Sequence, residues 1–342
     1  MNNAQLGILL ASLPLGLIVS MPLAGLLTNR YNIKGILTLA TFVYLILLVI
    51  LGFSTNVWQL YIVLFLFGVT RTFYNVSVNT ISVLLQAKFE KKIINSFHGV
   101  WSIAALVGAL LSLLLIGNNI GIRIHVMIVF IISLFLLLIY YRRVPDFTTV
   151  KSRFKLMDGR QKSLLYLGFI AFGSMFCEGI MADWSGLYFS KIGEVSNKYY
   201  VVGYTFYLTT MVVGRFFGDK IMAKYGESNV LKFSAILLAI GFLISIIFIS
   251  PTIIVIGFSL VGFGISCIVP ITFLLSSKNS SVPVGMAIST ISMMGYVGFL
   301  LGPPLIGFIS DALSLRWAFL TCFFFSILIG FFINKYQHMA SE

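Results

Sequence analysis

Long apolar runs separated by short polar stretches divide the 342-residue chain. Each run approaches the ~20 residues that a helix needs to cross a hydrocarbon core of ~30 Å. The eleven runs are approximately Leu6–Leu27, Gly35–Phe53, Trp58–Val78, Phe97–Gly117, Ile122–Tyr141, Leu164–Phe189, Tyr200–Gly218, Val230–Ile249, Ile253–Leu275, Val284–Ile309 and Leu315–Ile333. Apart from closed barrels, only helices satisfy their own backbone polar groups in lipid. The pattern therefore predicts an all-α membrane protein with about eleven spans.

The basic residues are distributed unevenly between the two sides of these spans. The formal net charge is +13, but only 10% of the residues are charged, against 59% hydrophobic. When the connections are assigned to alternating sides, one side holds most of the Lys and Arg residues. The other side holds only Arg123, Lys191, Lys198 and Arg316. This bias is the positive-inside signature. It predicts an inner (cytoplasmic) membrane location with the C-terminus in the cytoplasm, and it argues against nucleic-acid binding.

The residues that commonly hold cofactors or perform catalysis are sparse. Cys177, Cys267 and Cys322 lie in predicted spans and have no metal-binding spacing. The sequence contains no phosphate-binding loop of the G-x-x-x-x-G-K-[ST] type. We therefore expect no cofactor, no metal and no enzymatic activity.

A basic polar stretch divides the chain, and a weak internal repeat crosses it. Residues 142–162 predict a cytoplasmic linker between an N-terminal bundle of five spans, 1–141, and a C-terminal bundle of six, 163–342. Ala24–Arg30 aligns with Gly214–Lys220, because both have small residues at a helix end followed by Asn or Asp and a cation. The first segment ends the first span, whereas the second ends the second span of its half. This offset predicts a further helix before Met1.

These motifs resemble those of the major facilitator superfamily. Gly25–Lys34 is similar to the family's cytoplasmic loop signature, with Asn29 in place of the usual Asp, whereas Asp219 and Lys220 retain the charges. Arg71 matches the family's intramembrane arginine. The resemblance implies six plus six helices around a midplane site. It also implies that Met1 marks a misassigned start codon or a truncation. The residues of the resulting cytoplasmic gate motif are Gly25, Asn29, Arg30, Arg215 and Asp219.

A narrower resemblance concerns one branch of the superfamily. Phe176–Tyr188 contains E-G-x-x-x-D-W-S-x-x-Y and is similar to the YbjJ-like bacterial inner-membrane transporters. Asn75–Asn79 and Phe97–Ser102 also fit this branch, which is related in outline to fucose-permease-like carriers. The resemblance implies transport without defining a substrate.

Polar residues within one predicted span share a helical face. Arg71, Asn75, Asn79 and Ser82 are spaced by four, four and three residues. Ionisable groups at mid-membrane depth are costly and are functional candidates for that reason. This face is expected to line a water-filled cavity. The alternative is a structural Arg71 that binds backbone carbonyls of a neighbouring helix.

Two acidic residues in the Leu164–Phe189 span are candidates for proton coupling. Glu178 shares a face with Ser174, Met181 and Ser185. A carboxyl group in a low-dielectric site can exchange protons near neutral pH. The alternatives are a neutral Glu178 that packs two helices, or an ion pair of Glu178 with Arg71. Asp183 lies nearer the outside, where it either gates the outer mouth or is simply exposed at the interface.

The remaining polar and small residues predict structural roles. Arg215 and Asp219 are expected to form a latch on the cytoplasmic side, with little contact to substrate, and a proton relay at His98 is a minor alternative to a structural role. Small residues four apart allow helices to approach closely. The helix-packing candidates are Gly298, Gly302, Pro303 and Gly307. The span Phe97–Gly117 lacks the Gly-Pro pair of drug–proton antiporters, which disfavours efflux.

The resemblance and these residues together predict a secondary active transporter of a small polar solute, with a sugar-like solute as one candidate. Transport is expected to be coupled to protons and to proceed by rocking of two bundles in a monomer. The cavity candidates are Arg71, Asn75, Asn79, Glu178, Tyr204, Tyr207 and Thr290. The alternatives are a drug or metabolite efflux antiporter, a membrane sensor that does not transport, and a truncated relic.

Overall fold

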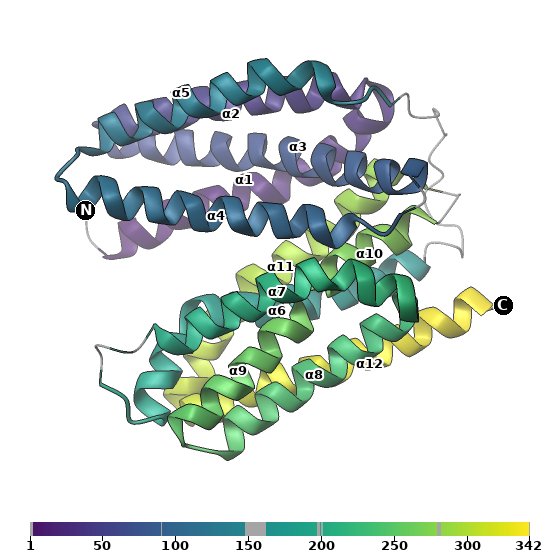
Figure 1. Cartoon of the computed structure of the whole chain (residues 1–342). Helices are drawn as coiled ribbons and strands as arrows, with labels where there is room; N and C mark the ends of the chain where they lie inside the picture. Colours follow the sequence, from purple (N-terminus) through teal and green to yellow (C-terminus); the bar gives the residue numbers. More distant parts are fainter. Residues whose placement is uncertain are drawn as a thin grey trace. The chain divides into compact units, whose positions relative to one another are not determined.

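The computed structural model describes residues 3–89, 91–147, 162–196, 199, 201–278 and 282–341. In these ranges α-helices account for nearly all regular structure, and no strand occurs (Figure 1). This arrangement confirms the predicted all-α class. Most of the predicted linker, residues 148–161, lies outside the described ranges, as do the basic Lys198 and the predicted span start at Tyr200.

The first part of the chain contains five long helices. Asn32 begins the second of them, because its side-chain oxygen accepts a hydrogen bond from the backbone N–H of Gly35 at 3.2 Å. The third helix is eleven residues longer at its C-terminal end than the predicted Trp58–Val78 span, since polar residues extend it beyond the apolar run. The helices are α1 Asn3–Arg30, α2 Ile33–Phe53, α3 Val57–Phe89, α4 Ile94–Gly117 and α5 Ile122–Tyr140, followed by a short 3-10 turn at Tyr141–Arg143.

Seven helices lie among the described residues of the second part. Gly226 is the only residue between α7 and α8, and its φ of 79° is in the left-handed region that glycine tolerates best. The helices are α6 Lys162–Ile192, α7 Val202–Tyr225, α8 Glu227–Ile247, α9 Pro251–Ile265, α10 Ile268–Ser277, α11 Val284–Ala312 and α12 Leu315–Ser341.

One predicted span is divided into two helices. The sequence pattern predicts one span over Ile253–Leu275, and in the structure α9 ends at Ile265 and α10 begins at Ile268. Pro270 explains the break, because its ring clashes with the carbonyl group four residues earlier, at Ser266, and because proline has no N–H to donate. The predicted span is present, because α9 and α10 together form one candidate membrane span, Pro251–Ser277.

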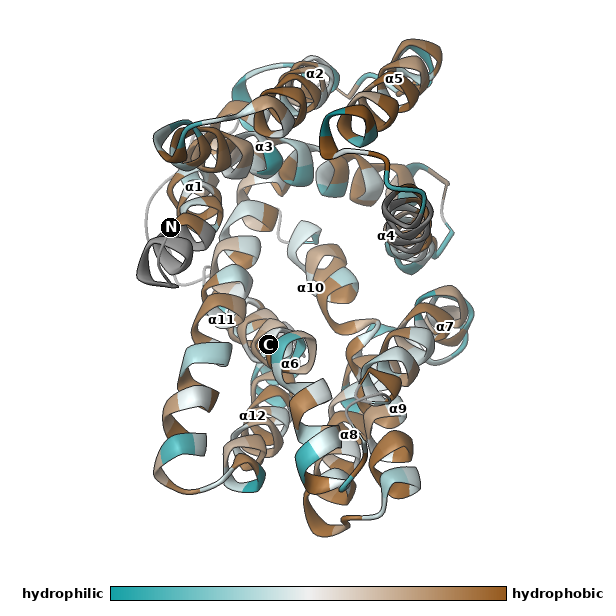
Figure 2. Cartoon of the chain, turned by 90° about the vertical axis from the view of Figure 1, so that its left-hand side faces the viewer, coloured by the Kyte–Doolittle hydropathy of each residue, from teal (hydrophilic) through white to brown (hydrophobic). Residues whose placement is uncertain are grey.

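Most of these helices are long and apolar enough to cross a membrane. Nine candidate spans are found among the described residues, with α9 and α10 counted as one span. Hydrophobic residues occur along most of the length of the helices (Figure 2). Many large apolar side chains are exposed, including Leu39, Phe135 and Ile236. Such exposure is expected for helix faces that contact lipid, and it is consistent with a multi-pass membrane protein.

The chain forms two compact units that differ from the two predicted bundles. Each unit contains a segment that the sequence assigns to the other bundle. Unit 1 comprises Met1–Leu85, Ile103–Lys155 and Ser280–Thr290, and unit 2 comprises Gln86–Ser102, Leu156–Asn279 and Ile291–Glu342. The N-terminal turns of α4 therefore belong to unit 2, and the first turns of α11 belong to unit 1.

An aromatic cluster forms the core of unit 2. The Tyr188 ring of α6 lies 4.1 Å from the Phe319 ring of α12 and 5.9 Å from the Phe258 ring of α9, measured between centroids. Phe242 of α8 completes the cluster at 6.3 Å from Phe319. The Tyr188 hydroxyl donates a hydrogen bond to the Ser245 carbonyl at 2.8 Å. Four helices are thus joined around one buried tyrosine, which fixes the register of α6.

Candidate transport site

The polar face of α3 lies in unit 1. Arg71, Asn75 and Asn79 are each partly buried. The Asn79 side-chain amide donates to the Asn75 carbonyl at 2.9 Å, and the Ser82 hydroxyl donates to the Val78 carbonyl at 2.8 Å. These bonds to the helix's own backbone satisfy donors that would otherwise be exposed in a span.

Close packing against α1 holds α3 in place. The Thr72 hydroxyl donates to the Leu17 carbonyl of α1 at 3.1 Å. Gly68 lies directly against the backbone at Leu13, and Gly16 lies against the backbone at Phe65. Since a Cβ atom at either glycine would collide with backbone atoms, the two helices can approach this closely only with glycine at both positions.

Glu178 lies in unit 2 on a face of α6 that carries two buried serines. The Glu178 side chain is partly buried, whereas Ser174 and Ser185 are fully buried. Neither serine hydroxyl has a hydrogen-bond partner among the described residues. Buried polar atoms are nearly always hydrogen-bonded, so a group without a partner calls for an explanation. These two hydroxyls therefore retain hydrogen-bonding capacity that the described residues do not use.

Two tyrosines of α7 lie close to this carboxyl group. The centroids of the Tyr204 and Tyr207 rings are 5.7 Å apart, and the rings are stacked. Both hydroxyls interact electrostatically with Glu178, and that of Tyr204 also interacts with Asp183. Tyr207 is only 1% exposed, and its hydroxyl oxygen has no hydrogen-bond partner in the described part of unit 2. The structure thus brings the sequence-predicted Glu178, Tyr204 and Tyr207 together.

Arg215 belongs to the same polar group, although the sequence associates it with the cytoplasmic latch. Its side chain is 7% exposed and interacts electrostatically with Glu178. The guanidinium donates a hydrogen bond to the Ser102 hydroxyl and lies 5.9 Å from the centroid of the Trp101 ring. A buried cation requires such partners. Sequence reasoning did not single out Trp101 or Ser102 as site residues. The sequence signal that could have found them is their position three and four residues after His98, which puts them on the same face of α4. This face contacts Arg215.

Three further sequence-predicted residues lie at the edge of this polar group or outside it. His98 is partly buried on α4, and its ring centroid lies 6.2 Å from that of Phe273. Asp183 is exposed, and the neighbouring Trp184 indole donates to the Pro303 carbonyl of α11 at 3.1 Å. Thr290 belongs to unit 1, where its hydroxyl donates to the Met286 carbonyl of its own helix at 2.9 Å.

Asp219, near the end of α7, binds the N-terminus of α4. One carboxylate oxygen accepts from the Asn95 backbone N–H at 3.0 Å and from the Asn95 side-chain amide at 3.1 Å. The other accepts from the Ser96 backbone N–H at 2.8 Å and from the Ser96 hydroxyl. The first N–H groups of a helix have no partner within the helix, and the helix dipole favours an anion there. Asp219 supplies both the missing acceptors and the negative charge.

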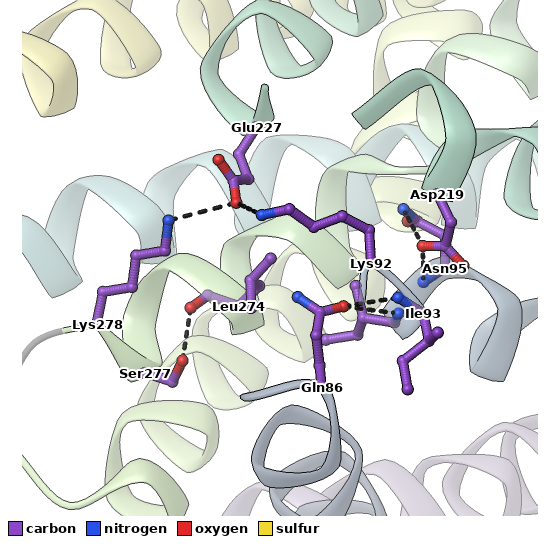
Figure 3. A network of polar contacts seen from close by, with 10 residues as sticks. Gln86, Lys92, Ile93, Asn95, Asp219, Glu227, Leu274, Ser277 and Lys278 are labelled. Carbon is purple, nitrogen blue, oxygen red and sulfur yellow. Dashed lines mark hydrogen bonds and ion pairs between the residues drawn. The ribbon is translucent and has the colours of Figure 1, made fainter. Parts of the chain in front are cut away.

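Gln86 and an ion-pair group complete this junction (Figure 3). The Gln86 side-chain oxygen accepts from the backbone N–H groups of Ile93 and Ile94 at 2.9 and 3.0 Å. Glu227, the first residue of α8, forms an ion pair with Lys92 and a second with Lys278 at 3.3 Å. The start of α4 is thus held by side chains from α3, α7 and α8, which explains why it belongs to unit 2.

The matching junction in unit 1 joins the end of α1 to the start of α11. The Ser289 hydroxyl donates to the Met21 carbonyl, and Gly25 lies directly against the Ser289 side chain. Gly285 similarly lies against Thr28. Asn29 is buried at 9% exposure, whereas Arg30 is exposed. Gly25 and Asn29 thus occupy in α1 the place that Gly214–Asp219 occupies in α7, in keeping with the internal repeat.

The small residues of α11 lie against α6 within unit 2. A Cβ atom at Gly298 would collide with the backbone of Phe172, and one at Gly302 would lie 2.9 Å from the Phe176 carbonyl oxygen. Gly307 has more room, since its nearest neighbour is the Trp184 ring at 3.5 Å. Gly298 and Gly302 therefore allow the closest approach of the two helices.

The searched part of the chain contains no group of three or more His, Cys, Asp or Glu side chains that could hold a metal ion. The polar groups assembled in unit 2 are a carboxyl group, a guanidinium and several hydroxyls. Such groups can bind a polar solute and move protons by hydrogen bonding and charge alone.

Comparison with solved structures identifies the fold. FucP, a major facilitator superfamily transporter, superimposes with a TM-score of 0.82 over 98% of this chain and 91% of its own, at 16% identity. A second structure of FucP describes it as the fucose:proton symporter of E. coli. The human organic anion transporter MFSD10 superimposes with a TM-score of 0.81 over 96% of this chain and 83% of its own, at 14% identity. Because FucP is named for fucose and MFSD10 for organic anions, the shared fold does not define a substrate.

Sequence comparison gives closer relatives. An uncharacterized MFS-type transporter of Yersinia pestis is 31% identical over 326 residues, which is 93% of this chain and 83% of that protein. The family model of the Major Facilitator Superfamily matches residues 1–282 and 201–336. The chain is a multi-pass membrane transporter and belongs to the Major Facilitator Superfamily.

Proposed function

We propose that this transporter is a proton-coupled symporter of a small polar solute such as a sugar. The observation that carries the proposal is the polar group in unit 2. Glu178 interacts electrostatically there with Arg215 and with the hydroxyls of Tyr204 and Tyr207. The buried hydroxyls of Ser174, Ser185 and Tyr207 have no partner among the described residues, so a hydroxyl-rich solute that reached them during the transport cycle would supply their missing hydrogen bonds.

In the proposed coupling, Arg215 and the solute compete for the Glu178 carboxyl group. When the carboxyl group is ionised, Arg215 stabilises it, and when it is protonated, it can donate a hydrogen bond to solute. A solute that binds only when Glu178 is protonated would carry one proton with it, because the bound state then contains both the solute and the proton. The fucose:proton symport of FucP, which shares the fold, supports this reading.

The two bundles predicted from the sequence, 1–141 and 163–342, would move relative to one another during alternating access. Arg71, Asn75, Asn79 and Thr290 would contribute polar groups from the first unit. Asp183 would act near the outer mouth. Gly25, Asn29, Arg30 and Asp219 would stabilise one end state at the cytoplasmic side, in an inner-membrane protein whose C-terminus is cytoplasmic.

The test is proton movement in proteoliposomes driven by L-fucose and other neutral monosaccharides. We expect the wild type to move protons with at least one of these solutes. Glu178→Gln is expected to lose solute-driven proton movement while it retains solute exchange, since glutamine keeps the shape and polarity but cannot ionise.

Two variants serve as controls. Glu194→Gln removes an exposed carboxyl group beyond the end of α6 and should behave as wild type. Asp183→Asn tests the other carboxyl group of α6, and it should keep solute-driven proton movement if Glu178 carries the coupling. Unchanged proton movement in Glu178→Gln would refute the coupling role, and transport of solute by the wild type without protons would refute symport altogether.

A further inference from the structure

An apolar cavity of about 230 Å³ lies between α6 and α12, away from the polar group. Phe169 and Phe172 of α6 line one side, and Phe325, Leu328 and Phe332 of α12 line the other. Phe169 and Leu328 are 43% and 44% exposed, so the cavity opens at the surface of unit 2.

The floor of the cavity depends on a glycine. Gly173 lies between the two helices, and a Cβ atom there would lie 2.9 Å from Ile329. Hydrocarbon side chains and this glycine make up the whole lining. Water in a cavity needs two to four polar partners, and apolar cavities stay dry. An opening of this kind on the surface of two membrane helices is therefore suited to a hydrocarbon chain.

The ring contacts set the register of the two helices. The Phe169 ring stacks on the Phe332 ring at 4.9 Å, and the Phe172 ring lies 5.8 Å from the Phe325 ring. Because the residue number falls along α12 as it rises along α6, the helices are antiparallel. Tyr166, one turn before Phe169, is 6.2 Å from Phe332, which places it at the level where α12 continues to Lys335.

Two lysines lie beyond the lining residues at one end of the cavity. Lys335 lies three residues after Phe332, and Lys162 lies four residues before Tyr166, so both continue the helical faces that line the cavity. Both side chains are exposed. They lie at the start of α6 and in the last turns of α12, where a lipid headgroup would be.

We propose that this groove binds an anionic phospholipid, such as phosphatidylglycerol, with one acyl chain lying along the exposed faces of Phe169 and Leu328 and the phosphate beside Lys162 and Lys335. The charge complementarity distinguishes this lipid from a neutral one, because juxtamembrane lysines attract anionic headgroups. The groove begins about one to two helical turns from the lysines. An acyl chain can cover this distance while its phosphate stays beside the lysines. The proposal does not depend on the transported solute or on proton coupling.

The test uses phosphatidylglycerol with a diazirine in its acyl chain, added to phosphatidylcholine vesicles that contain the purified full-length protein. After irradiation, the labelled peptides are mapped by mass spectrometry. We expect labelling to concentrate on α6 and α12 around Phe169 and Leu328. Unlabelled phosphatidylglycerol should compete, and extra phosphatidylcholine should not.

Variants separate the headgroup from the acyl chain. Lys162→Gln together with Lys335→Gln is expected to lower the preference for phosphatidylglycerol on the order of tenfold. Leu328→Trp, at an exposed position, should fill the groove and block labelling. The matched control is Lys224→Gln, which removes another lysine that lies over an aromatic ring near a helix end, at 5.1 Å from Tyr225, as Lys335 lies 5.7 Å from Phe331.

Equal labelling of all exposed helices would show only annular lipid and would overturn the proposal. Labelling of the groove that the double lysine variant does not change would also overturn it. Size-exclusion chromatography confirms that each variant is folded, and all of the substituted side chains are exposed.

Discussion

Asp219 shows how one carboxylate can organise a helix junction. It is 6% exposed and accepts hydrogen bonds from both the backbone and the side chains of Asn95 and Ser96. Its counterpart in the repeat, Asn29, has an amide in the same place and carries no charge. The favourable interaction of an anion with a helix N-terminus is therefore available in unit 2 through Asp219 but not in unit 1 through Asn29.

We predict that Asp219→Ala destabilises unit 2. The substitution leaves buried N–H groups of α4 without an acceptor, which costs on the order of 2 kcal/mol. Asp219→Asn should cost less, because the amide keeps one acceptor. Thermal unfolding of the detergent-solubilised protein, followed by intrinsic fluorescence, measures the effect.

Lys220→Ala is the matched control for Asp219, because the neighbouring Lys220 is exposed and its loss should leave the midpoint of unfolding unchanged. An Asp219→Ala protein that unfolds at the wild-type temperature would mean that the carboxylate contributes nothing to the junction.

At the scale of elements, the packing of α6 on α11 is set by small residues rather than by large apolar ones. Gly298 and Gly302 allow the α11 backbone to approach Phe172 and Phe176, while the Trp184 indole binds the Pro303 carbonyl. Pro303 and Pro304 lie inside a continuous helix. In α9 and α10, by contrast, Pro270 coincides with a break. Proline alone therefore does not predict where a helix ends.

We predict that Gly298→Ala weakens the α6–α11 contact, because its methyl group would overlap the Phe172 backbone, which cannot rotate away as a side chain can. The cost should be in the range of about 1–3 kcal/mol that overpacking typically causes. The measurement is the unfolding midpoint, together with the yield of folded protein from membranes.

Gly307→Ala on the same helix is the control for Gly298→Ala. Its Cβ would make only an ordinary contact with Trp184 at 3.5 Å, so stability should be close to that of the wild type. Equal loss in both variants would point to helix flexibility rather than to close packing as the role of these glycines.

At the scale of the whole molecule, the distribution of basic residues predicts its orientation. We expect a green fluorescent protein fused after Glu342 to fluoresce, because green fluorescent protein matures in the cytoplasm, where the C-terminus is predicted to lie. A cysteine introduced at Asn119, in the connection between α4 and α5, should react with a membrane-impermeant maleimide added outside intact cells.

Cys177, Cys267 and Cys322 are buried and should not interfere with this labelling. A cysteine at Lys91, in the connection between α3 and α4, should react only after the cells are permeabilised. The reverse pattern at these two positions would show that the positive-inside bias does not govern this chain.

The sequence by itself determined the membrane class, the approximate spans and the superfamily, because each depends on local composition and spacing. An apolar run of about 20 residues has few alternatives to a helix in lipid, and the repeat of Ala24–Arg30 at Gly214–Lys220 can be recognised in the sequence itself. The polar faces of α3 and α6 follow from helical periodicity alone.

Only the tertiary structure decided which of these polar faces contact one another. The sequence places Arg215 in a predicted cytoplasmic latch, and the structure adds its contacts with Ser102 and Trp101 and its electrostatic interaction with Glu178, which lie far from it in the sequence. The junction of Asp219 with Asn95 and the phenylalanine groove of α6 and α12 likewise join distant segments. A single sequence records the period of each helix, but the rotation and register of two packed helices depend on side chains from both, so these contacts appear only once the helices are placed together.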